Sequence, residues 1–202
     1  MIDCLSEVGH LTVPRETFLI LEEYVALLVA ANKVQNLIAE STVDNIWERH
    51  IVDSAQLVPM ARAGRWLDIG SGAGLPGVVV AIVTGEEVVL LEPRRLRVEF
   101  LQNVKQALGL SKLTIVQGKP SALKGQFENI AARAVAPASE LFAMARHLSH
   151  NGTKWLLPKG RGAKKELAAV HASWQGAFRL EPSRTDPTAS ILIGSNIRPR
   201  GK

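Results

Sequence analysis

Leu67-Asp68-Ile69-Gly70-Ser71-Gly72-Ala73-Gly74-Leu75-Pro76-Gly77 is the stretch that most constrains the fold of this 202-residue chain. It completes a short predicted strand, residues 65–70, and precedes an apolar segment that predicts a helix. Glycine is needed where the backbone takes a positive φ or where a ligand approaches the main chain closely. A glycine-rich turn between a strand and a helix therefore predicts a site for a nucleotide-like ligand, although the glycines alone do not select which one.

Outside this turn, short apolar runs alternate with segments of helical character. Strands are expected over residues 88–92, 113–116, 129–135, 154–157, 178–182 and 190–197, and helices over 94–108, 138–147 and 163–174. The continuous apolar run at 88–92 is typical of a parallel strand that is covered on both faces. This alternation predicts an α/β fold with a mostly parallel sheet and helices on both of its faces.

The first part of the chain predicts a helical cap, residues 1–64, in front of the sheet-forming core, residues 65–202. Helices are expected over 17–31 and 43–62, the second capped by Ser41 or Thr42. Within the second helix, His50 and Asp53 lie one turn apart. They are either an acid–base pair or a surface pair that fixes the cap against the sheet, and we favour the second interpretation.

The composition narrows the class of protein. Hydrophobic residues make up 47% of the chain and charged residues 21%, which excludes an intrinsically disordered protein. The sequence contains no apolar run of about 18 residues that would cross a membrane, and its start lacks the pattern of a signal peptide. The single cysteine, Cys4, excludes an internal disulfide and a cysteine-based zinc site. We therefore expect a cytoplasmic monomer without metal or membrane contact.

The net charge of +5 is distributed unevenly along the chain. Residues 1–64 hold nine acidic and four basic residues, a net charge of −5. Residues 65–145 carry +2, and residues 146–202 carry +8. A basic region of this kind indicates a polyanionic partner such as nucleic acid.

Two carboxylates flank the glycine turn. Asp68, two residues before the first glycine, would repel a pyrophosphate but suits a ligand with an ammonium group, such as S-adenosylmethionine. Glu92 ends the next strand, where a carboxylate can accept hydrogen bonds from both ribose hydroxyls of an adenosine ligand. Arg94 and Arg95 follow it and keep an NADP-dependent oxidoreductase open as an alternative, because arginines there can bind a 2′-phosphate.

If the cofactor is S-adenosylmethionine, the residues also bear on the methyl acceptor. Methylation of a pyrimidine carbon requires a cysteine nucleophile, and Cys4 is expected far from the ligand edge of the sheet. The Asn/Asp-Pro-Pro-aromatic loop of many amine methyltransferases is absent, since residues 132–137 read ARAVAP. A purine N7 has an in-plane lone pair and no proton, so its methylation needs alignment rather than a general base.

Five segments together resemble one bacterial family. They are NLIAE (36–40), RHIVDS (49–54), LDIGSGAGLPG (67–77), ARAVAP (132–137) and LPKG (157–160). In this order they closely resemble RsmG, also called GidB. That resemblance implies a Rossmann-like methyltransferase fold with a seven-stranded sheet. It also implies transfer of a methyl group from S-adenosyl-L-methionine to N7 of guanine 527, in the 530 loop of 16S rRNA within the small ribosomal subunit.

The resemblance also implies roles for individual residues. Arg133 would face the cofactor and the target base and is the expected catalytic residue, without a general base. The expected cofactor-binding residues are Asp68, Gly70, Gly72, Leu75, Glu92, Pro120, Ser121 and Arg133. The chain departs from the family where Lys119 and Ser121 replace an Arg-x-Glu pattern, and where it ends at NIRPRGK instead of a longer basic tail.

The same resemblance and the basic C-terminal third predict the RNA-binding residues. The resemblance implies that Lys159 approaches the RNA. The expected RNA contacts are Lys159, Arg161, Lys164, Lys165, Arg198 and Arg200. An RNA-binding protein that keeps this fold without catalysis remains a second alternative, beside the NADP-dependent oxidoreductase.

Overall fold

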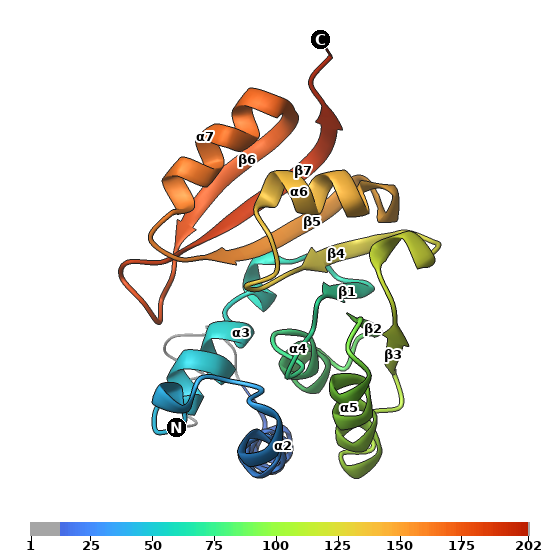
Figure 1. Ribbon diagram of the computed structural model, residues 1–202, viewed down its shortest axis with the longest axis vertical. Coiled ribbons are helices and arrows are strands. Elements are labelled where there is room, and N and C mark those ends of the chain that lie inside the picture. The colour runs from blue at the N-terminus through green and yellow to red at the C-terminus, as the bar shows by residue number, and fades with distance from the viewer. Residues whose placement is uncertain (1–12, 202) are drawn as a thin grey trace.

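The computed structural model describes residues 13–201, so the interpretation of Cys4 lies outside the described residues. Within this range the chain forms a seven-stranded sheet between two layers of helices (Figure 1). The strands are β1 (Trp66–Ile69), β2 (Val88–Glu92), β3 (Leu113–Gln117), β4 (Phe127–Ala131), β5 (Ser149–Lys159), β6 (Trp174–Pro182) and β7 (Ser190–Pro199). Their order across the sheet is β3-β2-β1-β4-β5-β7-β6.

Only β7 runs against the common direction of the sheet in the described part of the chain. It pairs antiparallel with β5 and β6, whereas β3, β2, β1, β4 and β5 pair in parallel. This confirms the expected mostly parallel α/β fold. The order differs from the 3-2-1-4-5-6 order of dinucleotide-binding sheets. β1 lies between β2 and β4, and all three strands run in parallel. Their carboxyl ends therefore share one edge, which is where such sheets bind ligands.

Helices cover both faces of the sheet, as expected. One layer contains α2 (Arg15–Gln35), α4 (Gly77–Thr84) and α5 (Arg95–Ala107), and the other contains α6 (Ala138–Ala145) and α7 (Ala163–Ser173) (Figure 1). β1 and β2 are buried along their whole length because both layers cover them. In residues 13–201 we find no helix that combines the length and the apolar character needed to cross a bilayer.

The N-terminal segment packs directly on the sheet-forming core. Leu21 and Leu28 of α2 belong to the same buried cluster as Val78 of α4 and Leu90 of β2. The hydroxyl of Tyr24 donates a 2.8 Å hydrogen bond to the carbonyl of Ala73, inside the glycine-rich turn. Helix α2 therefore supports that turn, and the proposed boundary at residue 64 does not divide the apolar core.

The continuous helix expected over residues 43–62 is wrong. The segment instead contains a π-helical turn (Trp47–Val52), the short α3 (Asp53–Ala55) and a 3-10 turn (Val58–Met60). Pro59 cannot donate the main-chain hydrogen bond that a continuing α-helix needs. The wider π-helical turn carries His50, and such turns are frequent at functional sites.

The expected strand over 129–135 ends earlier, at Ala131. The residues that follow leave the sheet as a loop, 132–137, because their polar groups bind other elements: Arg133 reaches the N-terminal segment and the carbonyl of Ala136 accepts from Lys159. Ala134 takes a positive φ of 56°. Because loop 132–137 directly follows the carboxyl end of β4, it lies at the ligand edge of the sheet.

Candidate functional site

The glycine-rich turn brings a strand end and a helix start unusually close together. Gly70 has a φ of 70°, and a Cβ atom there would lie only 2.6 Å from Cγ2 of Val135 in loop 132–137. A Cβ atom at Gly77 would lie 2.8 Å from Oδ2 of Asp68. A side chain would clash at both positions, because Val135 occupies the space at Gly70, and Leu90 and Asp68 occupy it at Gly77.

Asp68 is the carboxylate that has a buried oxygen without a hydrogen bond among the described residues. Its side chain is buried, and Oδ2 accepts a 3.0 Å hydrogen bond from the main-chain N–H of Gly77. Oδ1 is buried without a hydrogen-bond partner among residues 13–201. Burial raises the pKa of Asp68 to about 7. Hydrogen bonding from Gly77 and the nearby Ser71 hydroxyl and the charge of Arg133 lower it in part, and the charge of Glu92 adds a smaller rise. An unpaired buried carboxylate oxygen fits a cationic nitrogen of a ligand.

Glu92 holds a second carboxylate at the neighbouring strand end. Its Oε2 accepts a 2.8 Å hydrogen bond from the N–H of Gly72, and its Oε1 accepts a 2.9 Å bond from the N–H of Arg94. These bonds fix the plane of the carboxylate at the end of β2. Each oxygen retains further acceptor capacity, which suits a pair of ribose hydroxyls.

The other expected cofactor residues lie around this edge in different roles. Pro120 and Ser121 form a 3-10 turn after β3, in which Pro120 is buried and Ser121 is exposed. The side chain of Leu75 packs into the apolar cluster beneath the glycine turn. It therefore supports the turn from below.

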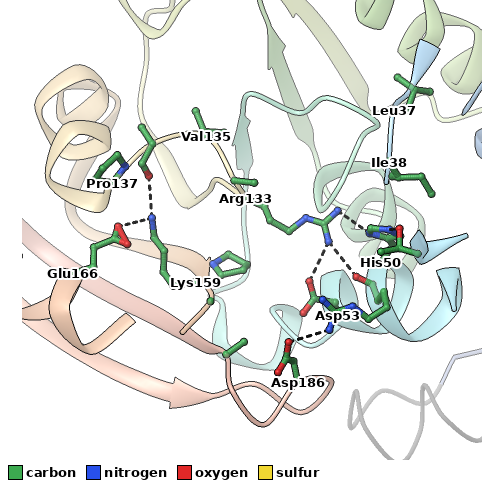
Figure 2. Close-up of a pocket in the computed structure, with 17 residues that line it drawn as sticks. Leu37, Ile38, His50, Asp53, Arg133, Val135, Pro137, Lys159, Glu166 and Asp186 are labelled. Atoms are coloured by element: carbon green, nitrogen blue, oxygen red, sulfur yellow. Dashed lines mark hydrogen bonds and ion pairs between the residues drawn. The ribbon is translucent and has the colours of Figure 1, made fainter. Parts of the chain in front are cut away.

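A cavity of about 640 Å³ lies beside loop 132–137 (Figure 2). The N-terminal segment lines one side, and the end of β5 with the start of α7 lines the other. Arg133 points across to the N-terminal segment: its Nη1 lies 3.1 Å from Oδ2 of Asp53 and 3.4 Å from the carbonyl oxygen of Arg49. Its Nη2 lies 3.3 Å from Nδ1 of His50.

The contacts of His50 define its protonation. Thr42 Oγ1 donates to the carbonyl of Ala39 at 2.7 Å, so it accepts from Nε2–H of His50, which is 2.8 Å away. Nδ1 is then the acceptor for Arg133. Burial, followed by the positive charges of Arg133 and Arg49, lowers the pKa of His50 to about 4. The imidazole is therefore neutral at pH 7, and both of its nitrogens are engaged.

Asp53 links Arg133 to the loop between β6 and β7. Its Oδ1 accepts a 2.9 Å hydrogen bond from Oγ1 of Thr185 and a 2.8 Å bond from Nε2 of Gln56. Nearby, Arg49 and Asp186 form an ion pair of 3.0 Å. His50 and Asp53 thus fix the N-terminal segment against the core, as the favoured interpretation predicts, and they do so through Arg133 and this loop.

On the other side of the cavity, Lys159 is not a free cation. Its Nζ lies 2.6 Å from Oε1 of Glu166 and donates a 3.0 Å hydrogen bond to the carbonyl of Ala136. The side chain of Lys159 is only 12% exposed and ties β5 to loop 132–137. Its expected approach to the RNA stays a prediction, and an RNA group could meet it only from the cavity. The remaining expected RNA contacts are exposed: Arg161, Lys164, Lys165, Arg198 and Arg200.

Several residues of the site escape sequence reasoning. Gln56 and Thr185, which bind Asp53, and Asp186, which lines the cavity, have no local signal. The contacts of Thr185 and Asp186 form only when β6 and β7 fold back onto the N-terminal segment. For Glu166, the sequence pattern indicates only one charged residue on an exposed helix face. Within the described range, no cluster of three or more metal-ligand side chains is present.

Comparisons with known proteins agree with this architecture. Residues 18–181 match the GidB family, described as rRNA small subunit methyltransferase G. A Rhizorhabdus wittichii protein named Ribosomal RNA small subunit methyltransferase G is 49% identical over 196 residues, covering 94% of this chain and 90% of the relative. A Zymomonas mobilis protein of the same name is 45% identical, covering 95% of this chain and 91% of the relative.

Solved structures of lower identity share the fold. The ribosomal protein L11 methylase of Lactobacillus delbrueckii subsp. bulgaricus aligns with a TM-score of 0.60 at 13% identity, covering 73% of this chain and 78% of that chain. The M. jannaschii protein TYW2, solved in complex with AdoMet, aligns with a TM-score of 0.57 at 8% identity, covering 75% of this chain and 76% of that chain. At these identities the likeness shows the fold alone.

His50→Gln is expected to reduce the loss of stability on acidification. The unfolded chain protonates this histidine near pH 6.5 and the folded protein only near pH 4, so the wild type loses stability as the pH falls through that window. Glutamine keeps one donor and one acceptor but does not titrate. Urea unfolding at a series of pH values measures the difference, and the titration of Asp68 is common to both proteins.

The exposed His171 provides a matched control for this experiment. His171→Gln should follow the wild-type profile throughout. A His50→Gln profile parallel to the wild type between pH 6.5 and pH 4 would contradict a neutral imidazole held by Thr42 and Arg133.

Proposed function

The chain belongs to the rRNA small subunit methyltransferase G family, and we propose that it methylates N7 of guanine 527 in the 530 loop of 16S rRNA, with S-adenosyl-L-methionine as donor. One observation carries the proposal beyond family membership. Loop 132–137 borders both the glycine turn, where Val135 lies against Gly70, and the cavity of about 640 Å³. A cofactor at the turn and a base in the cavity would therefore meet at this loop.

The residues at the sheet edge fit the cofactor. When bound, S-adenosylmethionine supplies an electrophilic methyl group on a sulfonium. The unpaired Oδ1 of Asp68 is suited to its ammonium group, and the fixed carboxylate of Glu92 is suited to its ribose hydroxyls. A buried carboxylate has little affinity for a pyrophosphate, and the sheet order differs from that of dinucleotide-binding folds, so the NADP-dependent alternative finds no support.

The arrangement of the cavity suits an acceptor that needs no general base. Both nitrogens of His50 are engaged, and both oxygens of Asp53 accept hydrogen bonds from Arg133, Thr185 and Gln56. Neither group is free to take a proton. A purine N7 carries none, so the work of these residues is to hold Arg133 and the base in line and to exclude water.

The exposed basic side chains form the surface through which we expect the protein to bind the small ribosomal subunit. Arg161, Lys164 and Lys165 lie at the start of α7, and Arg198 and Arg200 lie at the end of β7. All come from the segment 146–202, whose net charge is +8. We place the protein with ribosomes in the cytoplasm, as a monomer that binds rRNA through this surface.

The affinity for S-adenosylmethionine should fall as the pH drops from 7 to 5. Below its pKa of about 7, Asp68 must lose a proton before it can bind the ammonium group. The dissociation constant should therefore rise by up to about tenfold for each pH unit. Titration calorimetry measures it, with Asp44→Asn, an exposed aspartate, as control.

Asp68→Asn should bind the cofactor weakly and with little dependence on pH over the same range. Wild-type affinity that stays constant between pH 5 and pH 7 would show that Asp68 does not hold the ammonium group.

Arg133→Ala should lower methyl transfer by about 100-fold, because the side chain that spans the cavity is lost. Small subunits from a strain without the enzyme are incubated with labelled cofactor, and 7-methylguanosine is mapped by strand scission. Arg146→Ala, at an exposed arginine directly after the end of α6, should retain normal rates. Unmodified rRNA with the wild type would reject the catalytic proposal and leave an RNA-binding protein.

The pair Lys164→Glu and Lys165→Glu should weaken rRNA binding and flatten its salt dependence. Each lost phosphate contact lowers the slope of log K against log salt by about 0.7–0.9. Filter binding over a range of salt concentrations gives the slope. A charge-matched pair on α2, Arg15→Glu with Lys33→Glu, should leave it unchanged, and an unaltered slope in the first pair would remove the start of α7 from the RNA surface.

A further inference from the structure

Lys159 and Glu166 face the cavity from the side opposite Arg133 (Figure 2). Lys159 ends β5, and Glu166 lies in the first turn of α7. Their side chains are 12% and 20% exposed, and no step of methyl transfer described above uses them. The pair is therefore a largely buried ion pair in the cavity wall, and its role in the proposed reaction still needs an explanation.

The hydrogen bonds of this pair leave one donor and one acceptor available. The ammonium of Lys159 has three N–H groups, of which one binds the carbonyl of Ala136 and one binds Oε1 of Glu166. Oε1 of Glu166 also accepts from the N–H of Ala138 at 2.5 Å. Oε2 accepts from none of residues 13–201. The third N–H of Lys159 and Oε2 of Glu166 thus remain available on two side chains that are joined by an ion pair.

In the other carboxylates of the cavity, each oxygen already accepts at least one hydrogen bond. Both oxygens of Asp53 are engaged by Arg133, Thr185 and Gln56. Asp186 accepts from Arg49 on one oxygen and from the main chain and hydroxyl of Thr188 on the other. Glu166 is the carboxylate whose second oxygen remains for a ligand in the described part of the cavity.

A neighbouring donor and acceptor match one purine and mismatch the other. Guanine presents an acceptor at O6 beside a donor at N1–H, whereas adenine presents a donor at N6 beside an acceptor at N1. We propose that Lys159 and Glu166 recognise the target guanine, with Lys159 donating to O6 and Oε2 of Glu166 accepting from N1–H. This assignment rests on the proposed function and adds the residues that select the base.

The same contacts would orient the base for transfer. In guanine, O6 lies between N1–H and N7, so a base held at O6 and N1–H presents N7 on the adjoining side. The ammonium of Lys159 is bonded to Ala136, and Glu166 to the N–H of Ala138, at the end of loop 132–137. One pair thus fixes both the base and the loop that borders the cofactor site.

The test uses small subunits reconstituted with three purines at the target position: guanine, hypoxanthine and 2,6-diaminopurine. All three carry N7, but diaminopurine reverses the donor and acceptor at positions 6 and 1. Wild type should methylate guanine and hypoxanthine at similar kcat/KM and reject diaminopurine. In Glu166→Gln, whose amide can both donate and accept, the ratio of guanine to diaminopurine should fall at least about tenfold.

The exposed Glu140, in the first turn of α6, provides the control Glu140→Gln, which should keep the wild-type ratio. A Glu166→Gln variant that loses activity equally on all three purines has only lost a structural tie, and that result would overturn the proposal. Wild-type methylation of diaminopurine at the rate of guanine would overturn it as well.

Two further outcomes keep the two proposals distinct. If Glu166→Gln does not fold, the ratio is measured with Lys159→Met, which removes the donor to O6 and should also lower the preference for guanine. If wild type methylates none of the purines, the proposed function itself fails. If it methylates guanine while both variants keep the wild-type ratio, only the assignment of Lys159 and Glu166 fails.

Discussion

The guanidinium of Arg133 holds three distant parts of the chain in one place. It binds Asp53 and His50 in the N-terminal segment, and through Asp53 it reaches Thr185 between β6 and β7. The ion pair with Asp53 is about four-fifths buried on both sides, so it is shielded from solvent more than a surface pair would be. Without these bonds, loop 132–137 would lose its polar contacts to the N-terminal segment, which would still be held by its apolar packing and by contacts such as the Arg49–Asp186 ion pair.

The two ends of the site illustrate different uses of charge. Around Arg133 every acidic and basic group has a partner, which gives rigidity and leaves no free base. At the glycine turn, in contrast, the carboxylate of Asp68 is buried with one oxygen unpaired. Ionisation of this buried carboxylate opposes folding. Such a local penalty is common where a protein keeps a binding site prepared for a ligand. The glycine turn and the cavity beside loop 132–137 thus differ in how completely the protein pairs their charged groups.

Local signals in the sequence predict the cofactor edge well. The glycines after β1 and the acidic residues Asp68 and Glu92 stand next to strand ends, and parallel strands bring such ends together. The predicted strand over 129–135 is too long because several residues of loop 132–137 are apolar. The backbone of that loop leaves the sheet because Arg133 and Ala136 bind other elements. The cavity beside loop 132–137 resists prediction because Asp186 and Glu166 reach it only through long-range packing, and because the pairing of Lys159 cannot be inferred from a run of basic residues.

Asp53 is proposed to act on methyl transfer through Arg133, which it holds by an ion pair of 3.1 Å. A double-mutant cycle of Asp53→Asn and Arg133→Lys, scored by kcat/KM on small subunits, measures this coupling directly. We predict that Asp53→Asn slows transfer in the wild-type background but has much less effect once Arg133 is replaced, a coupling of about 0.5–3 kcal/mol. Fully additive effects of the two substitutions would contradict the claim and would show that Asp53 contributes to the protein independently of Arg133.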